Sequence, residues 1–142
     1  MKKILIINAN YYKDISKNLT LSAVKILKKK KWRVYTINVS GIFEIPIMLR
    51  KYIKKYDAFI VLGCVIKGDT PHFDLISSST FNAIMKISIE FKKPIGNGII
   101  TCLNLKQAKI RSSSLKNLKK PNKGIEAANA VVSVLENEPK LF

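Results

Sequence analysis

The chain has 142 residues, a length that favours one domain, 1–142, with one hydrophobic core. Its 26 Lys and Arg residues outnumber 9 Asp and Glu residues, which gives a formal net charge of +17. No segment approaches the ~20 consecutive apolar residues of a membrane span, and the apolar run at the N-terminus lacks the length and cleavage site of a signal peptide. We therefore expect a cytoplasmic protein without a membrane partner.

The positive charge has two interpretations. A basic surface can bind nucleic acid or an acidic membrane, or the lysines can simply cover solvated surfaces. The lysines are scattered over expected helix surfaces and loops, without the interleaved aromatic residues that a stacking platform for bases requires. We therefore favour solvated surfaces and expect no nucleic-acid partner.

Strand-like apolar runs alternate along the chain with helical patterns. From the N-terminus we expect, in order, strand 2–8, helix 15–30, strand 32–38, helix 43–55, strand 57–66, helix 71–92, strand 94–102 and helices 104–113 and 122–137. The third strand is almost continuously apolar, as expected where both faces of a strand are buried.

Three of the expected helices carry apolar residues at helical spacing, which predicts the face that each buries. These stripes are Ile15, Leu19, Ala23 and Ile26 in the first helix, Phe73, Ile76, Thr80, Ile84, Ile87 and Phe91 in the third, and Ile125, Ala128, Val132 and Leu135 in the last.

The alternation of strands and helices predicts a parallel sheet with helices on both faces. The simplest arrangement with right-handed crossovers is a flavodoxin-like three-layer α/β sandwich with strand order 2-1-3-4. Ligands of such sheets bind beyond the carboxyl ends of the strands. Those ends lie at residues 8–12, 38–44, 65–72 and 96–102.

The two cysteines, Cys64 and Cys102, lie within or at the end of apolar runs. They form no CxxC motif and have no histidine at metal-binding spacing. We expect two reduced thiols in the core and no metal site.

The stretch GCVIKGDTPHFD, residues 63–74, ends a strand and begins a helix with the sole histidine of the chain. Gly68 allows a tight turn or the close approach of a ligand, Thr70 is a candidate N-cap, and Pro71 a candidate first helical residue. The free backbone N–H groups of that first turn favour a phosphate. His72 is then either a neutral ring that can accept a proton or a surface histidine without a role.

This stretch resembles the lumazine synthase family. Four further stretches match the family in the right order: VSGIFEIP at 39–46, PIGNGIIT at 94–101, QAKIR at 107–111 and NKGIEAA at 122–128. The resemblance implies the flavodoxin-like fold already expected. It also implies a reaction that joins two small molecules, 5-amino-6-ribitylaminouracil, which is a ribitylaminopyrimidinedione, and 3,4-dihydroxy-2-butanone 4-phosphate.

The implied product is 6,7-dimethyl-8-ribityllumazine, which forms in the penultimate step of riboflavin biosynthesis, and phosphate and water are released. The family needs no metal and no organic cofactor. In the family, the histidine that matches His72 transfers protons during imine formation, phosphate elimination and ring closure. Such acid–base catalysis contributes ~10²–10⁴-fold to a rate.

The resemblance also implies substrate contacts in the first half of the chain. An aromatic ring at Tyr11, or at the adjacent Tyr12, stacks on the pyrimidine. Asn10 and Lys67 stand where the family often has arginine. The other implied contacts are Ile42, Phe43 and Glu44 to the ribityl chain, the backbone of Cys64, Val65 and Ile66 to the ring, and Gly68, Asp69 and Thr70 to the phosphate.

Four residues of the second half match family positions. Arg111 matches an arginine that grips the phosphate from a neighbouring subunit. Lys123 and Glu126 match a lysine and a glutamate of the site, although at this spacing they are equally well explained as a surface helix pair. Asn97 replaces a phenylalanine, so one stacking contact is in doubt.

The resemblance implies a homopentamer with shared active sites, or a decamer of two pentamers. The chain begins at its first strand, and 11 residues separate Arg111 from Lys123. We expect both features, with the charge, to oppose the icosahedral shell that some family members form. Two other functions stay open: a non-catalytic lumazine or flavin carrier of the same fold, and a nucleic-acid-binding protein.

Overall fold

The computed structural model describes residues 1–113 and 122–142. The elements, in chain order, are β1 (Lys3–Ala9), α1 (Lys13–Lys28), β2 (Arg33–Val39), the 3₁₀ turn η1 (Ile42–Glu44), α2 (Ile45–Tyr52), β3 (Ala58–Ile66), α3 (His72–Phe91), β4 (Ile95–Cys102), α4 (Leu105–Ser112) and α5 (Lys123–Glu136). The expected order and type of elements are confirmed. The segment between Arg111 and Lys123, on which the argument against a shell partly rests, lies mostly outside the described residues.

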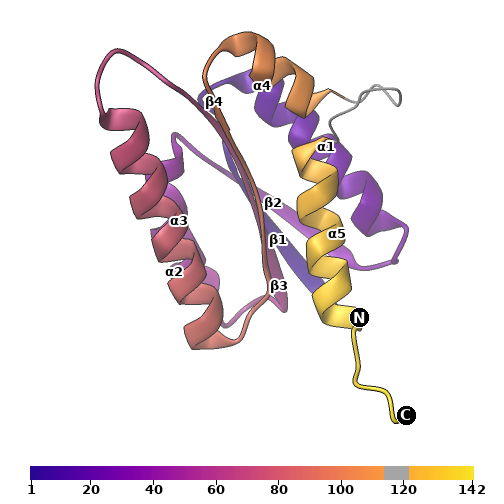
Figure 1. Ribbon diagram of the computed structural model, residues 1–142. Coiled ribbons are helices and arrows are strands. Elements are labelled where there is room, and N and C mark those ends of the chain that lie inside the picture. The colour runs from indigo at the N-terminus through magenta and orange to yellow at the C-terminus, as the bar shows by residue number, and fades with distance from the viewer. Residues whose placement is uncertain (114–121) are drawn as a thin grey trace.

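The four strands form one parallel sheet in the order β2-β1-β3-β4. Helices α2 and α3 cover one face, and α1, α4 and α5 cover the other (Figure 1). The three-layer, flavodoxin-like α/β fold with order 2-1-3-4 is therefore confirmed. In the described part of the chain, no helix is long and apolar enough to cross a membrane.

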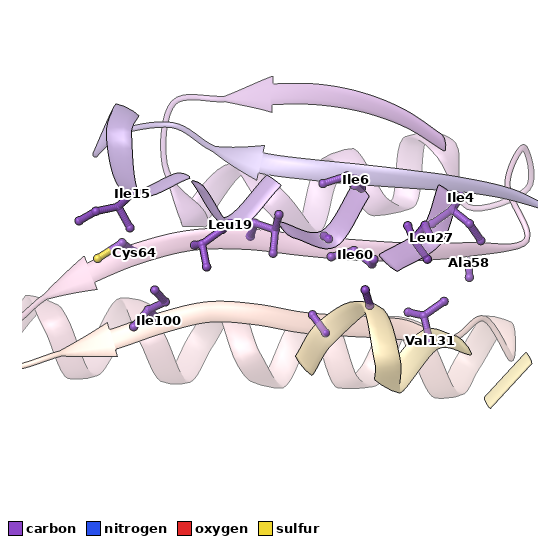
Figure 2. Close-up of a cluster of buried hydrophobic side chains, with 14 of the residues drawn as sticks. Ile4, Ile6, Ile15, Leu19, Leu27, Ala58, Ile60, Cys64, Ile100 and Val131 are labelled. Carbon is purple, nitrogen blue, oxygen red and sulfur yellow. The ribbon is translucent and has the colours of Figure 1, made fainter. Parts of the chain in front are cut away.

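The central strands contribute to two cores because successive side chains point to opposite faces. On β1, Ile4 and Ile6 face α1, whereas Leu5 and Ile7 face α2 and α3. Figure 2 shows the first of these cores, in which strand side chains pack against the buried stripe of α1 and against Val131 of α5. Every residue of β3 up to Cys64 is buried, as the continuous apolar run predicted.

Helix α5 packs more closely than its apolar stripe predicted. A Cβ at Gly96 of β4 would collide with the Ala127 carbonyl, and one at Gly124 would collide with the Leu19 carbonyl of α1. Of the predicted stripe, Ala128 is buried, Val132 and Leu135 pack against the core while half-exposed, and Ile125 is half-exposed. The structure buries the smaller residues on the adjacent face and leaves the larger ones half-exposed; the buried residues are Gly124, Ala127, Ala128 and Val131.

Aromatic rings gather with lysines at the amino ends of the strands. Tyr56 contacts Tyr35, Tyr52 and Phe59 edge-on, with ring centroids 5.4–6.2 Å apart. Lys51 and Lys55 place their ammonium groups 5.7 and 5.5 Å from the Tyr52 ring centre. Aromatic rings therefore do lie beside some of the lysines here, although the expectation concerned a stacking platform for bases. The rings pack edge-on against each other and the two ammonium groups lie over Tyr52, so the cluster is not a row of free ring faces for bases.

Candidate active site

Two adjoining hollows lie beyond the carboxyl ends of the strands, where ligands of such sheets bind. The first, of about 310 Å³, is lined by Tyr11, Tyr12, Gly41, Ile42, Cys64, Val65, Ile66, His72 and Ile76. The second, of about 400 Å³, is lined by Phe43, His72, Leu75, Ile76 and Ser79. The two share His72 and Ile76, and we call them together the cleft. A pair of sites with a titratable group in their common wall suits a reaction between two small molecules.

His72 reaches the cleft because α3 begins directly after a short exposed turn. The Lys67 N–H donates to the Cys102 carbonyl at 2.8 Å, which prolongs the β3–β4 pairing, and Leu75 N–H donates to the Pro71 carbonyl at 3.1 Å. The N-cap is Pro71, so the expectation that Thr70 caps the helix is wrong by one position. Thr70 Oγ1 still accepts from the His72 N–H, at 3.4 Å. Other N–H groups of this first turn stay available to an anion.

Gly68 lies in this turn with free space around it. It has no positive φ, and a Cβ added there would meet nothing within 4 Å. Gly68 allows this turn, as expected, but the backbone conformation there does not need a glycine. The close approach of a ligand remains a reason for the residue, and Asp69 and Thr70 beside it are likewise exposed.

Residues 41–43 line one side of the cleft, and Glu44 follows them. Ile42 is buried beneath it, whereas Phe43 is 67% exposed and lines the second hollow. The Glu44 carboxylate lies close to Gly41, since a Cβ there would be 3.3 Å from Oε2. Ser40 Oγ donates to Glu44 Oε1 at 3.3 Å. The carboxylate thus stands near the rim of the first hollow, where it can accept hydrogen bonds from hydroxyl groups.

Tyr11 and Tyr12 both line the first hollow, with their rings edge-to-face and their centroids 5.0 Å apart. Tyr12 packs against the core, and burial, with a smaller effect of Cys64 and Tyr11, raises the pKa of its hydroxyl. Tyr11 is 74% exposed. Of the two rings, Tyr11 is therefore the one free to stack on a ligand.

The two cysteines are free and buried, as expected, and the fold brings them together although 38 positions separate them. Burial, with a smaller contribution from Cys102, raises the pKa of the Cys64 thiol to about 12. Burial also raises the pKa of Cys102, although the nearby Arg111 opposes the shift. Both thiols are protonated at neutral pH, so Cys64 shapes the cleft and does not act as a nucleophile.

The four candidate residues of the second half do not join this cleft within one chain. Arg111 lies on α4 near Cys102 and donates from Nη1 to the Gln107 carbonyl at 3.5 Å. Lys123 Nζ and Glu126 Oε2 form an ion pair at 2.9 Å on α5, on the opposite face of the sheet from α3. Asn97 is exposed on the edge strand β4, where its Oδ1 accepts from the Ile99 N–H at 3.0 Å.

Sequence reasoning missed several residues of the cleft. Gly41 belongs to a matched motif, and Ile76 follows His72 by one helical turn, which places both on the same face of α3. The helical period could therefore have identified Ile76. Within residues 1–113 and 122–142, no group of three or more His, Cys, Asp or Glu side chains could hold a metal ion.

Comparison with known proteins identifies the family of this chain. The family model for 6,7-dimethyl-8-ribityllumazine synthase matches residues 1–138. The chain belongs to the 6,7-dimethyl-8-ribityllumazine synthase family. Two proteins named 6,7-dimethyl-8-ribityllumazine synthase, from Corynebacterium kroppenstedtii and Bartonella bacilliformis, are each 35% identical to it. These matches cover 92% and 93% of this chain, and 80% and 87% of the relatives.

A third relative, 6,7-dimethyl-8-ribityllumazine synthase 1 of Rhodopseudomonas palustris, is 37% identical over 98% of this chain and 87% of its own length. The 6,7-dimethyl-8-ribityllumazine synthase family consists of transferases, so the chain belongs to an enzyme family. Neither the family model nor these relatives support the alternative of a non-catalytic carrier.

Proposed function

We propose that the chain, as a single domain, condenses 5-amino-6-ribitylaminouracil with 3,4-dihydroxy-2-butanone 4-phosphate in the cleft. The products are 6,7-dimethyl-8-ribityllumazine, phosphate and water. The observation that carries the proposal is the position of His72 in the wall shared by two hollows, in a chain of this family. Membership of the family supports the reaction, and the cleft supports the place where it occurs.

The first hollow suits the ribitylaminouracil. Tyr11 offers an exposed ring for stacking, and the carboxyl end of β3 supplies backbone groups at Cys64, Val65 and Ile66. Glu44 at the rim is placed to accept hydrogen bonds from the ribityl hydroxyls.

The turn before α3 suits the phosphate of the second substrate. The first N–H groups of α3 and the helix dipole attract an anion. Gly68, Asp69 and Thr70 are exposed, with room for a phosphate beside Gly68, and Lys67 adds a positive charge next to them. A phosphate bound there leaves more readily, because the same groups stabilise the charge on the departing oxygens.

His72 transfers protons between these two positions. The ring accepts a proton from the attacking amine, returns one to the hydroxyl that leaves as water when the imine forms, and then assists phosphate elimination and ring closure. An exposed histidine can exchange its proton with solvent between steps. Holding both substrates side by side supplies much of the remaining rate.

We also propose that the site is completed in a homopentamer of 16.0 kDa chains, or in a decamer of two such rings. Arg111 of a neighbour would then grip the phosphate with a bidentate contact, and Asn97, Lys123 and Glu126 of that neighbour would border the cleft. Two observations support an assembly. These four residues lie away from the cleft in one chain, and α3 has an exposed stripe of heptad spacing, formed by Leu75, Ser78, Asn82, Met85 and Ile89.

A cytoplasmic location fits this proposal. Cys64 and Cys102 are free thiols side by side, and such thiols persist in a reducing compartment. Fractionation of cells that express the full chain tests the location.

The reaction is tested directly by mixing the purified protein with both substrates and following lumazine absorbance and fluorescence. We expect product to accumulate over many turnovers and to require both substrates. Tight binding of 6,7-dimethyl-8-ribityllumazine with no turnover would contradict the proposal and would indicate a carrier.

A further inference from the structure

A polar groove, separate from the cleft, lies between α1 and the outer strand β2. It has a volume of about 280 Å³ and shares no lining residue with the cleft. Helix α1 covers the inner strands, and β2 at the edge of the sheet keeps Thr36 and Asn38 exposed. The lining residues are Asn8, Asn10, Lys13, Ser16, Lys17, Thr20, Leu21, Thr36 and Asn38.

The composition of this groove points to an anion that carries hydroxyl groups. Eight of the nine lining residues are polar, two of them are lysines, and no carboxylate lines the groove in the described part of the chain. The carboxylate nearest in sequence, Asp14, is exposed in the first turn of α1 and is not part of the lining. Lys13 and Lys17 are one helical turn apart, so both ammonium groups can reach one ligand.

Asn8 is a buried amide with an unmet acceptor at the floor of the groove. It is 5% exposed and follows Ile4 and Ile6 on the α1 face of β1, where an apolar residue would be expected. Its Nδ2 donates to Asn38 Oδ1 at 3.3 Å, which directs the amide toward β2 and the groove. Its Oδ1 has no hydrogen-bond partner within residues 1–113 and 122–142. A buried acceptor without a donor is costly, which favours a site that a ligand donor fills.

The N-terminus of α1 is a second feature that attracts an anion. The helix begins at Lys13, and its N-cap Tyr12 makes no side-chain capping bond. The first N–H groups of this 16-residue helix therefore retain hydrogen-bonding capacity, and the dipole is positive at this end. Lys13 belongs both to this first turn and to the lining of the groove.

We propose that the groove binds a small phosphorylated polyol, with the phosphate at Lys13, Lys17 and the start of α1. The hydroxyl groups of the ligand then reach the amides of Asn8 and Asn38, and the free Oδ1 of Asn8 accepts from one of them. A groove of about 280 Å³ accommodates a phosphorylated sugar of five or so carbons. This site is separate from the condensation reaction in the cleft.

Calorimetric titration of the full chain with ribose 5-phosphate, ribose and inorganic phosphate tests the site. We expect ribose 5-phosphate to bind at least about tenfold more tightly than either of the other two, because it alone meets both halves of the groove. Inorganic phosphate that binds equally well would overturn the assignment of a polyol. Absence of binding by all three probes would overturn the site.

Two charge-reversed variants locate the binding. Lys17→Glu should weaken ribose 5-phosphate binding about tenfold or more, whereas Lys25→Glu, which makes the same charge change on an exposed part of α1 outside the groove, should not. Equal affinity in the two variants would overturn the proposal, since the sugar phosphate would then be bound elsewhere, as in the phosphate position of the cleft. Neither variant should alter lumazine formation, so the test is independent of the proposed reaction.

The variant Asn8→Val distinguishes a role of Asn8 in ligand binding from a role in stability. We expect a thermal midpoint as high as that of the wild type or higher, together with loss of ribose 5-phosphate affinity. Retained affinity would show that the amide has no part in binding. If the variant does not fold, the Lys17→Glu comparison still decides the location.

Discussion

Helix α5 packs at backbone distance on the face of the sheet covered by α1, α4 and α5, whereas the face covered by α2 and α3 leaves His72 and the apolar side chains Leu75, Met85 and Ile89 exposed. On the first face, glycines bring α5 against β4 and α1 at backbone distance. On the second, His72 and Leu75 both line an open hollow. The first layer thus contains helices packed at backbone distance, and the second carries the histidine of the candidate site. The variants below test this division.

The largest effect is expected at His72. His72→Ala should lower kcat by ~10²–10⁴-fold, because it removes the titratable group in the wall between the two hollows. Its stability should stay close to that of the wild type, because the side chain is exposed. Steady-state kinetics and thermal unfolding measure the two effects.

Ser79→Ala is the matched control for this variant, since Ser79 lines the second hollow without a group that titrates. It should retain most of the activity. A His72→Ala variant as active as Ser79→Ala would remove His72 from the chemistry.

A pair of glycine variants compares the two faces directly. Gly124→Ala should lower the free energy of unfolding by ~1–3 kcal/mol, because its Cβ would press on the Leu19 carbonyl and force α5 away from α1. Gly68→Ala should change it by less than ~0.5 kcal/mol, because the space around Gly68 is open and its φ is not positive. Urea denaturation of both variants gives the two values.

The same pair should separate stability from catalysis. We expect Gly68→Ala to raise the KM for the butanone phosphate, since a methyl group would occupy space assigned to the phosphate. A Gly68→Ala variant that is destabilised as much as Gly124→Ala would mean that the turn before α3 is part of the structural framework after all.

The smallest effect concerns Cys64 and appears only at high pH. Because the folded-state pKa of its thiol is raised from 9.0 to about 12, the native state keeps a proton that the unfolded state loses. The stabilisation is fully present below pH 9 and is lost as the pH rises from about 9 toward 12, with a slope of at most ~1.4 kcal/mol per pH unit.

Denaturation of the wild type and Cys64→Ala at a series of pH values isolates the contribution of the Cys64 thiol to the free energy of unfolding. Both proteins share the titration of the many lysines, so that titration cancels in the comparison. The wild type should lose stability faster than the variant above pH 9. Parallel curves would show that the thiol is not buried as described.

The fold could be predicted because it depends on signals that are local in sequence. The continuously apolar β3 and the alternation of elements gave the parallel order, and a topology rule placed the cleft at the strand ends before any residue was identified. The position of His72 followed from the same rule together with the start of α3.

The features that the sequence could not predict depend on contacts that no local pattern encodes. The most buried residues of α5 are set by close contacts with Gly96 and Leu19, which lie on other elements, so the stripe of large residues identified only part of the packed face. The contact between Cys64 and Cys102 depends on the register of β3 against β4. The proposed relation of Arg111 to the cleft would depend on a neighbouring subunit, and the periodicity of one chain carries no information on such a contact.

The central claim, that His72 of one subunit and Arg111 of its neighbour form one site, is tested by mixing two inactive variants. His72→Ala and Arg111→Ala should each be nearly inactive alone. After joint unfolding and refolding at equal amounts, roughly a quarter of the interfaces in a cyclic ring combine an intact His72 with an intact Arg111. We predict that about that fraction of wild-type activity returns. A mixed sample that remains as inactive as the separate variants would contradict the shared site and place both residues' work within a single chain.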